Sequence, residues 1–297
     1  MKRQICIVSL LVFVSVAYSA EIPKYEEYFV QTVVNFDSIS GIYKYNYTLI
    51  NPVGNKNELW SLDIYIPKDP KGIELSWENL TYGEGYSRTS SETIKDKIIA
   101  VGIDGPSGWT YGIGYDEEGK GFVGSATLSG IEILPGSSVK GLILTSYGLP
   151  AIRDTMLQPY VDTDSLPDEY YENEELSKQL QDSLIYHTKT IGPTAPPLDF
   201  NPLSFLDYII SMKHEAFSLG WITNKGIEMS LDQKLDAARK KLSAGDTKTA
   251  KNILNALINE VEAQGCETYE GCPKGKHLTP EAYALLKYNV LYLIERL

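Results

Sequence analysis

The chain of 297 residues is poor in the residue types on which many enzyme and metal sites depend. It has three histidines and three cysteines. No two histidines stand one helical turn apart beside a carboxylate, which is the spacing of a metallohydrolase helix. No G-x-S-x-G elbow or Walker loop is present, and the glycines of GIGYDEEGKG lie between expected strands rather than before a helix. The paired carboxylates of a glycosidase stay open, because a sequence does not show their geometry.

Basic residues are also scarce. Lys and Arg number 27 against 39 Asp and Glu, a net charge of −12. Nucleic acids and anionic membranes attract clusters of basic side chains. We therefore expect no nucleic acid partner.

Long apolar runs are limited to the N-terminus. The opening MKRQICIVSLLVFVSVAYSA joins Lys2 and Arg3 to an apolar run and a small-residue exit at Ala20, the layout of a secretory signal peptide. The run is short for a bilayer span, which needs about 20 apolar residues. We expect residues 1–20 to be a cleaved signal peptide and the mature chain to be secreted or on the cell surface, with the periplasm as an alternative. No later segment predicts a membrane span.

Two cysteines follow the expected cleavage site, Cys266 and Cys272 in CETYEGC. In an oxidising compartment, a close pair in a polar, glycine-containing loop predicts a disulfide. Such a small closed loop stabilises the fold by about 2 kcal/mol. His277 offers an alternative zinc set with the two cysteines, but a structural zinc site needs a fourth ligand. We expect a disulfide and neither a metal nor a cofactor.

From about Tyr28 to Tyr147 the sequence shows the period-two pattern of strands separated by turn clusters, and we expect a domain over residues 21–160. In IEILPGSSVKGLIL, Pro135 and Gly136 suit the two central positions of a type II turn. This pattern predicts an antiparallel β-sandwich. The expected strands are IYKYNYTLI (42–50), LWSLDIYI (59–66), KDKIIAVGI (95–103), SGWTYGIGY (107–115) and VKGLILTSY (139–147).

The turn and the strand after it resemble the immunoglobulin-like (Ig-like) sandwich modules of secreted bacterial proteins. The resemblance implies an Ig-like topology and covers about a dozen positions. Its residues are Pro135, Gly136, Ser138, Gly141, Ser146, Gly148, Leu149 and Pro150.

Residues 161–197 differ in composition from both flanks. The first part is acidic, and the prolines of IGPTAPPLDFNP disfavour helix and strand interiors alike. A calcium loop is one interpretation of Asp162, Asp164, Asp168 and Glu172. However, Leu166 and Pro167 stand where a ligand and the turn glycine are needed. We expect a connecting segment with a solvated linker or the start of a short helix near Asp168, and a domain boundary near Pro197.

Residues 198–297 show the period of amphipathic helices. Ser230 is the expected N-cap of one helix and Gly245 its stop, Asp246 caps the next, and Pro280 opens the last. A fourth helix is expected around Leu206, Ile209, Ile210 and Phe217. Together the four helices predict a small four-helix bundle. The apolar positions are Leu231, Leu235, Ala238 and Leu242, then Ala250, Ile253, Leu254, Leu257, Ile258 and Val261, then Leu286, Val290, Leu293 and Leu297.

These helices are similar to the C-terminal helical module called FIMAH in bacterial extracellular proteins. The match covers about the last 80 residues and departs at the CETYEGC loop and at Leu257, where an aromatic residue is common. It implies an attachment or interaction role and supplies no catalytic residues. Its residues are Gly220, Ile222, Ile227, Leu231, Lys234, Leu235, Ala238, Leu242, Gly245, Asp246, Ala250, Leu254, Asn255, Ala256, Ile258, Asn259, Val261, Leu278, Thr279, Ala282 and Leu285.

Aromatic residues of the strand region offer one candidate binding surface. Trp77, Trp109 and Tyr111 are candidates for stacking on sugars or peptides, with core packing as the alternative. We therefore expect a secreted, non-catalytic surface or envelope protein for adhesion, scaffolding or ligand binding, with a cell-surface glycan or protein as partner. The alternative is an accessory or binding part of an extracellular carbohydrate-active hydrolase.

Overall fold

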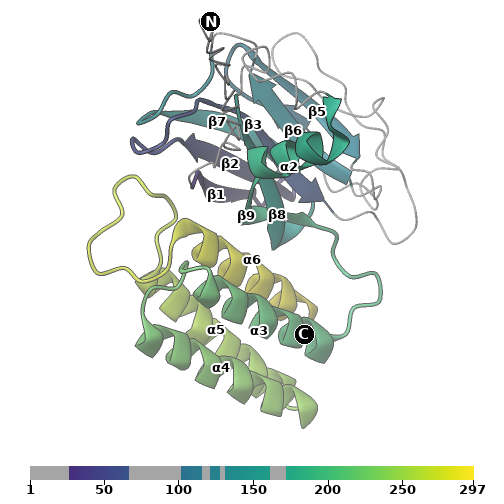
Figure 1. The fold of residues 1–297 in the computed structure, drawn as a ribbon. Helices are drawn as coiled ribbons and strands as arrows, with labels where there is room; N and C mark the ends of the chain where they lie inside the picture. Colours follow the sequence, from purple (N-terminus) through teal and green to yellow (C-terminus); the bar gives the residue numbers. More distant parts are fainter. Residues whose placement is uncertain (1–26, 67–101, 116–120, 128–130, 161–171) are drawn as a thin grey trace, which may run out of the picture.

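The computed structural model describes residues 27–66, 102–115, 121–127, 131–160 and 172–297. This part of the chain combines antiparallel sheets with helices that follow them in sequence (Figure 1). The strands are β1 (Phe29–Asp37), β2 (Ile42–Ile50), β3 (Leu59–Ile66), β4 (Gly102–Asp104), β5 (Trp109–Tyr115), β6 (Gly121–Thr127), β7 (Ser138–Ser146), β8 (Leu149–Pro159) and β9 (Tyr186–Thr194). The helices are α2 (Glu174–Leu184), α3 (Pro202–Ser218), α4 (Lys225–Ser243), α5 (Thr247–Gln264) and α6 (Pro280–Arg296).

The strands form two antiparallel sheets with the orders β1-β2-β7-β4 and β5-β6-β3-β8-β9. Alternate residues of β2 and β7 and most of β3 are buried between the sheets, as the period-two pattern requires. Tyr45 and Tyr47 of β2 lie on the inner side, as do Leu62 and Ile64 of β3. The predicted bounds of β2 and β3 are confirmed to the residue. Most of the expected strand 95–103 lies outside the described residues.

The turn before β7 has the predicted conformation. Gly136 takes a φ of 81°, which favours glycine, and the Ser137 N–H donates to the Leu134 carbonyl across 3.0 Å. A positive φ at the third of four residues, with this hydrogen bond, is the geometry of a type II turn. Pro135 precedes Gly136 and sets the φ of the second position.

The expectation of a connecting segment over residues 161–197 is wrong for its last third. Residues 186–194 form β9, which pairs with β8 along its whole length. Pro193 is tolerated because β9 is the edge strand of its sheet, where no further strand requires its missing N–H. Before it, α2 begins after Asn173, whose side chain accepts hydrogen bonds from the N–H groups of Glu175 and Leu176.

Local capping residues explain where the C-terminal helices begin. Asp246 accepts from Thr249 N at the start of α5, and Pro280 stands in the first turn of α6, both as predicted. The predicted N-cap Ser230 is wrong. Helix α4 begins at Lys225, because the Asn224 side chain accepts from Gly226 N and Ile227 N and so satisfies the free amides of the first turn.

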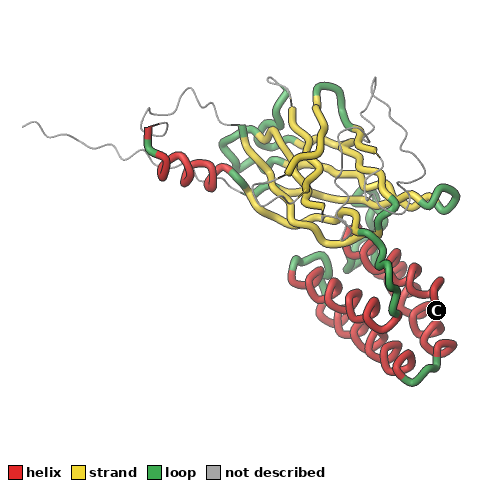
Figure 2. The backbone as a smooth tube through the Cα atoms, turned by 90° about the vertical axis from the view of Figure 1, so that its right-hand side faces the viewer, coloured by secondary structure: helices red, strands yellow, loops and turns green. Residues whose placement is uncertain are grey.

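The four helices α3–α6 pack on one another and on the sheets (Figures 1 and 2). Helix α6 lies against β1 and β8, and α3 contacts β8. The Asn289 Nδ2 donates to the Pro150 carbonyl across 2.8 Å, and the Tyr288 hydroxyl donates to the Val34 carbonyl across 3.3 Å. A single apolar cluster extends from the space between the sheets into the helices. The sheets and helices therefore share one core.

Helix α2 lies apart from α3–α6 in both views (Figure 2). None of the helices in the described part of the chain combines the length and the apolar character that crossing a bilayer requires.

Candidate functional site

A hollow of about 290 Å³ opens where the ends of β8 and β9 meet the start of α3. Its floor and walls combine apolar, aromatic and polar side chains. The lining residues are Leu149, Thr194, Ala195, Pro197, Asp199, Asn201, Ser204, Phe205 and Tyr208. A hollow of this size and mixed lining suits a small ligand.

The aromatic wall comes from the first two turns of α3. Asn201 starts this helix by accepting a hydrogen bond from Ser204 N across 3.0 Å, and Pro202 supplies a preset φ in the first turn. Phe205 is buried, whereas Tyr208 is 38% exposed, with the two ring centroids 6.0 Å apart. Burial raises the pKa of Tyr208. Tyr208 therefore stays a neutral phenol that offers a ring face and a hydroxyl to the hollow.

Two exposed polar groups beside this wall are free to bind a ligand. Within the described part of the chain, the Asp199 carboxylate and the Asn201 side-chain nitrogen make no hydrogen bond. The hollow thus offers an acceptor and a donor close to an aromatic ring. The nine described residues of the lining include no histidine, lysine or cysteine.

Arg153 of β8 fixes the strand end next to this hollow. Its Nε donates to the Pro193 carbonyl across 2.9 Å, one residue before Thr194 of the lining. Burial lowers the pKa of the Arg153 guanidinium, while the nearby Tyr208 acts in the opposite direction. Its Nη2 is buried with no hydrogen-bond partner. This side chain positions the hollow's wall and keeps a positive charge behind Tyr208.

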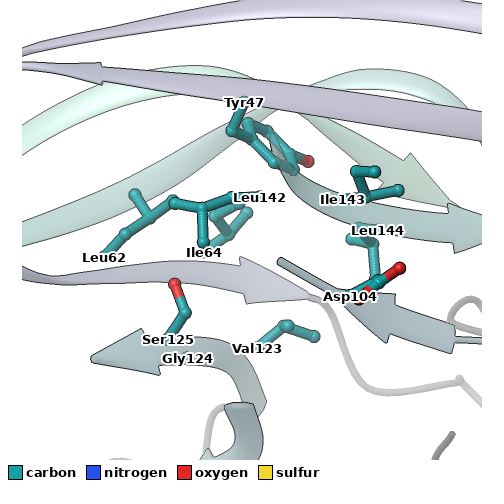
Figure 3. A pocket seen from close by; sticks show the side chains of 10 residues that line it. All are labelled: Tyr47, Leu62, Ile64, Asp104, Val123, Gly124, Ser125, Leu142, Ile143 and Leu144. Atoms are coloured by element: carbon teal, nitrogen blue, oxygen red, sulfur yellow. The ribbon is translucent and has the colours of Figure 1, made fainter. Parts of the chain in front are cut away.

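A second, smaller cavity of about 20 Å³ lies between the two sheets (Figure 3). Figure 3 shows Tyr47, Leu142 and Leu144 of one sheet facing Leu62 and Ile64 of the other. The lining is almost wholly apolar, with room for about one water molecule. This space is a packing void of the core rather than a ligand site.

Asp63 lies on the outer face of the five-stranded sheet, opposite the core-facing Leu62 and Ile64. Its carboxylate lies over Gly124, where a Cβ would clash with Oδ1, so the glycine makes room for it. Burial raises the pKa of Asp63 to about 7. No hydrogen bond within the described residues compensates that burial. A carboxyl with such a pKa exchanges its proton near neutral pH, a property that the sequence pattern does not reveal.

A charged cluster joins α3 to α4. Lys213 is fully buried, and its Nζ lies 2.6 Å from both Glu228 Oε1 and Asp232 Oδ1. His214 Nε2 is 3.1 Å from the same Asp232 oxygen. The oxygens and nitrogen of His214, Glu228 and Asp232 are close enough together to hold a metal ion. The Lys213 ammonium already lies between the two carboxylates, so we interpret the cluster as a buried ion pair that links the helices.

Of the three aromatic residues of the predicted binding surface, the structure describes the side chain of Trp109. Trp109 opens β5 and is 8% exposed, within the core between the sheets. Tyr111 lies in β5 opposite Ser125, but its side chain falls outside the described set. Trp77 also lies outside the described residues, as do Asp162, Asp164 and Asp168 of the calcium hypothesis. The buried position of Trp109 agrees with the packing interpretation and leaves little ring surface for a ligand.

Cys266 and Cys272 form the predicted disulfide. Their sulfur atoms are bonded to each other and are therefore not ligands of a zinc set with His277.

Sequence reasoning missed the hollow because its residues lie on both sides of the expected boundary. Leu149 comes from the expected strand region, Thr194, Ala195 and Pro197 from the expected connecting segment, and Asp199 to Tyr208 from the expected helical domain. The mixture of proline, aromatic, Asp and Asn residues in APPLDFNP is a sequence signal of the hollow, but the same mixture is typical of a domain boundary. No protein-family model matches the chain, and no curated protein matches it in sequence.

Proposed function

We propose that this chain is a secreted, non-catalytic binding protein of the cell surface or envelope, with its ligand site in the hollow beside α3. The observation that carries the proposal is the exposed Tyr208 ring next to the free groups of Asp199 and Asn201. The signal-like N-terminus and the disulfide support an extracellular location. We also propose that the sheets form an Ig-like sandwich and that α3–α6 form a FIMAH-like four-helix bundle.

The lining suggests a neutral saccharide as the ligand. The apolar face of a sugar ring stacks on an aromatic side chain, while its hydroxyls pair with carboxylate and amide groups. Tyr208 offers the ring, Asp199 the acceptor and Asn201 the donor. The net charge of −12 and the Asp199 carboxylate disfavour anionic glycans, because both repel negative charge. An uncharged glycan suits the hollow best.

The lining also supports binding rather than hydrolysis. Glycoside hydrolysis generally uses two carboxyl groups about 5 to 9.5 Å apart. Among the nine described residues of the lining, Asp199 is the one acidic residue. If the chain is instead the binding part of a carbohydrate-active hydrolase, this hollow would hold the substrate and other residues would cleave it.

Glycan binding by the full mature chain tests the proposal. We expect a neutral glycan from an array to bind and to remain intact in solution. Tyr208→Ala should weaken binding about tenfold, since loss of ring stacking costs about 1 kcal/mol or more. Tyr160→Ala is the matched control, because Tyr160 is 41% exposed but lies outside the hollow. Equal affinity of both variants would contradict the site, and hydrolysis products would favour the enzymatic alternative.

A further inference from the structure

The disulfide loop between α5 and α6 contacts both the helices and the sheets. Cys266 lies two residues after the end of α5, and the loop closes at Cys272. Inside it, the Tyr269 hydroxyl donates to Glu281 Oε2 across 2.5 Å, and Glu270 pairs with Lys140 of β7. Figure 1 shows this loop beside the lower edge of the sheets, at the level of α6. Residues held by the disulfide therefore reach the junction between sheets and helices.

Glu281 is the centre of that junction. It is 1% exposed, in the first turn of α6. Its Oε1 accepts a hydrogen bond from the Thr32 N–H across 2.7 Å. Thr32 belongs to the edge strand β1, and its Oγ1 lies 2.5 Å from Oγ1 of Thr190 in β9. One buried carboxyl group thus connects both sheets, α6 and the disulfide loop.

The two hydrogen bonds to Glu281 differ in how firmly they are held. The Thr32 N–H is part of a strand that pairs with β2 over nine residues. Tyr269 lies in a loop without regular structure, closed by the bridge only three residues later. The loop also contacts the sheets through the ion pair between Glu270 and Lys140. Both side chains of this pair are exposed, so it contributes little to the stability of the loop. Glu267 of the same loop accepts a hydrogen bond from the Tyr283 hydroxyl of α6 across 2.6 Å, but its side chain is 69% exposed, so this contact also contributes little. The position of the Tyr269 hydroxyl therefore depends mainly on the disulfide.

One sulfur of the bridge is open to attack. Cys266 is 4% exposed, whereas Cys272 is an exposed residue. Exposed disulfides are the more readily reduced ones, because an incoming thiolate must reach a sulfur atom along the S–S axis. Attack on Cys272 Sγ by an external dithiol would break the S–S bond and release Cys266 as a thiolate, which takes up a proton. The second thiol of the reagent then attacks the mixed disulfide, leaving two cysteine thiols and the oxidised reagent.

We infer that the Cys266–Cys272 bridge is a redox-sensitive clasp that holds α6 against β1 through Tyr269 and Glu281. In the oxidised chain, Tyr269 and Thr32 both donate to the buried Glu281. In the reduced chain, the loop is released and Glu281 Oε2 loses its donor. A buried carboxyl without that donor draws water into the junction, and the first turn of α6 separates from β1.

Hydrogen exchange of the Thr32 amide measures this directly. The oxidised full-length mature chain is compared with the same chain after treatment with a small dithiol, with two free thiols verified by mass spectrometry. We expect the Thr32 amide to exchange at least tenfold faster after reduction. The amide of Leu235, buried in α4, is the internal reference and should keep its rate.

Three variants separate the clasp from general unfolding. Tyr269→Phe in the oxidised chain removes only the hydroxyl and should speed exchange of Thr32 as reduction does. A double variant with Cys266→Ala and Cys272→Ala should match the reduced chain and not respond to the dithiol. Glu270→Gln, which breaks only the exposed pair with Lys140, is the control and should exchange like the wild type. Unchanged exchange of Thr32 after verified reduction overturns the clasp, and so does equal acceleration at Thr32 and Leu235.

Discussion

The Thr32 N–H and the Glu281 carboxylate, 249 positions apart in sequence, meet at 2.7 Å in the buried junction between β1 and α6. An edge strand leaves backbone donors unpaired, and a buried donor without a partner costs about 1–3 kcal/mol. Glu281 satisfies this donor, while burial raises the pKa of its own carboxyl. The junction therefore depends on a polar group as well as on the shared apolar core.

Two substitutions of Glu281 should distinguish the contribution of its hydrogen bonds to stability from the contribution of its charge. Glu281→Ala leaves Thr32 N–H and the Tyr269 hydroxyl without their acceptor and creates a cavity, so we expect a loss of about 3 kcal/mol in the free energy of unfolding. Glu281→Gln keeps an oxygen for Thr32 and carries no charge, so it should lose less than half as much. Urea unfolding of the two variants measures both values. Equal losses would show that the oxygen facing Thr32 does not stabilise the junction.

Asp63 should make the chain less stable as the pH rises. Its pKa is about 7 in the folded chain against an ordinary value of 3.8, so the folded state binds the proton more tightly. The free energy of unfolding should therefore fall between about pH 4 and pH 7 and level off above that. Asp63→Asn should remove this fall in the free energy of unfolding with pH. The variant should be about 2 kcal/mol more stable than the wild type at pH 8.

Urea unfolding at several pH values from 4 to 8 measures how steeply the free energy of unfolding of Asp63→Asn changes with pH. Asp199→Asn is the matched control, because Asp199 is exposed in the hollow, and it should keep the wild-type slope. A wild-type slope in Asp63→Asn would mean that Asp63 is ionised in the folded chain well below neutral pH.

The buried pair of Lys213 and Glu228 predicts an acid-sensitive helix contact. The hydrogen bond from Lys213 lowers the pKa of Glu228 to about 2 from an ordinary 4.5, so this stability is present above pH 4.5 and is lost as the pH falls through 2. Glu228→Gln leaves Lys213 with only Asp232 as a counter-charge and should cost about 3 kcal/mol at pH 7.

Thermal and urea unfolding at pH 7 test the pair. Lys225→Ala removes the other, largely exposed partner of Glu228 and should cost about 0.5 kcal/mol. If the two variants lose the same stability, the burial of Lys213 does not determine the strength of the contact.

A side chain at position 265 should destabilise the fold. A Cβ there would lie 2.5 Å from Tyr283 Cδ2 and 2.7 Å from the Val261 carbonyl oxygen, and the carbonyl belongs to the backbone of α5. We expect Gly265→Ala to cost about 2 kcal/mol. The control Gly226→Ala meets only the Asn224 side chain, at 3.1 Å, and should change the stability by less than half as much. Circular dichroism during thermal unfolding gives both values.

Capping and turn residues could be assigned from the sequence where one residue type dominates the local chemistry. Asp246, Pro280 and Gly136 hold the predicted positions, because a carboxylate, a fixed φ and a missing Cβ act within a few residues. Ser230 was misassigned because Asn224 is an equally good cap and starts the helix earlier. Pattern alone does not choose between two capping residues six positions apart.

The strand β9 could not be predicted for a different reason. Its glycine, proline and short polar residues disfavour a strand in isolation, yet pairing with β8 and an edge position make it stable. The same applies to the candidate site, whose Leu149 and Tyr208 become neighbours only when α3 packs beside β8.

By itself, the sequence determined the periodicity of the strands and helices, the cap at Asp246, the turn at Gly136 and the disulfide, since each depends on residues close together in the chain. Only the tertiary structure decided the shared core, the hollow beside Tyr208, and the meeting of Thr32 with Glu281. Those features depend on which apolar faces pack together, and packing brings together side chains whose separation in sequence carries no trace of their contact.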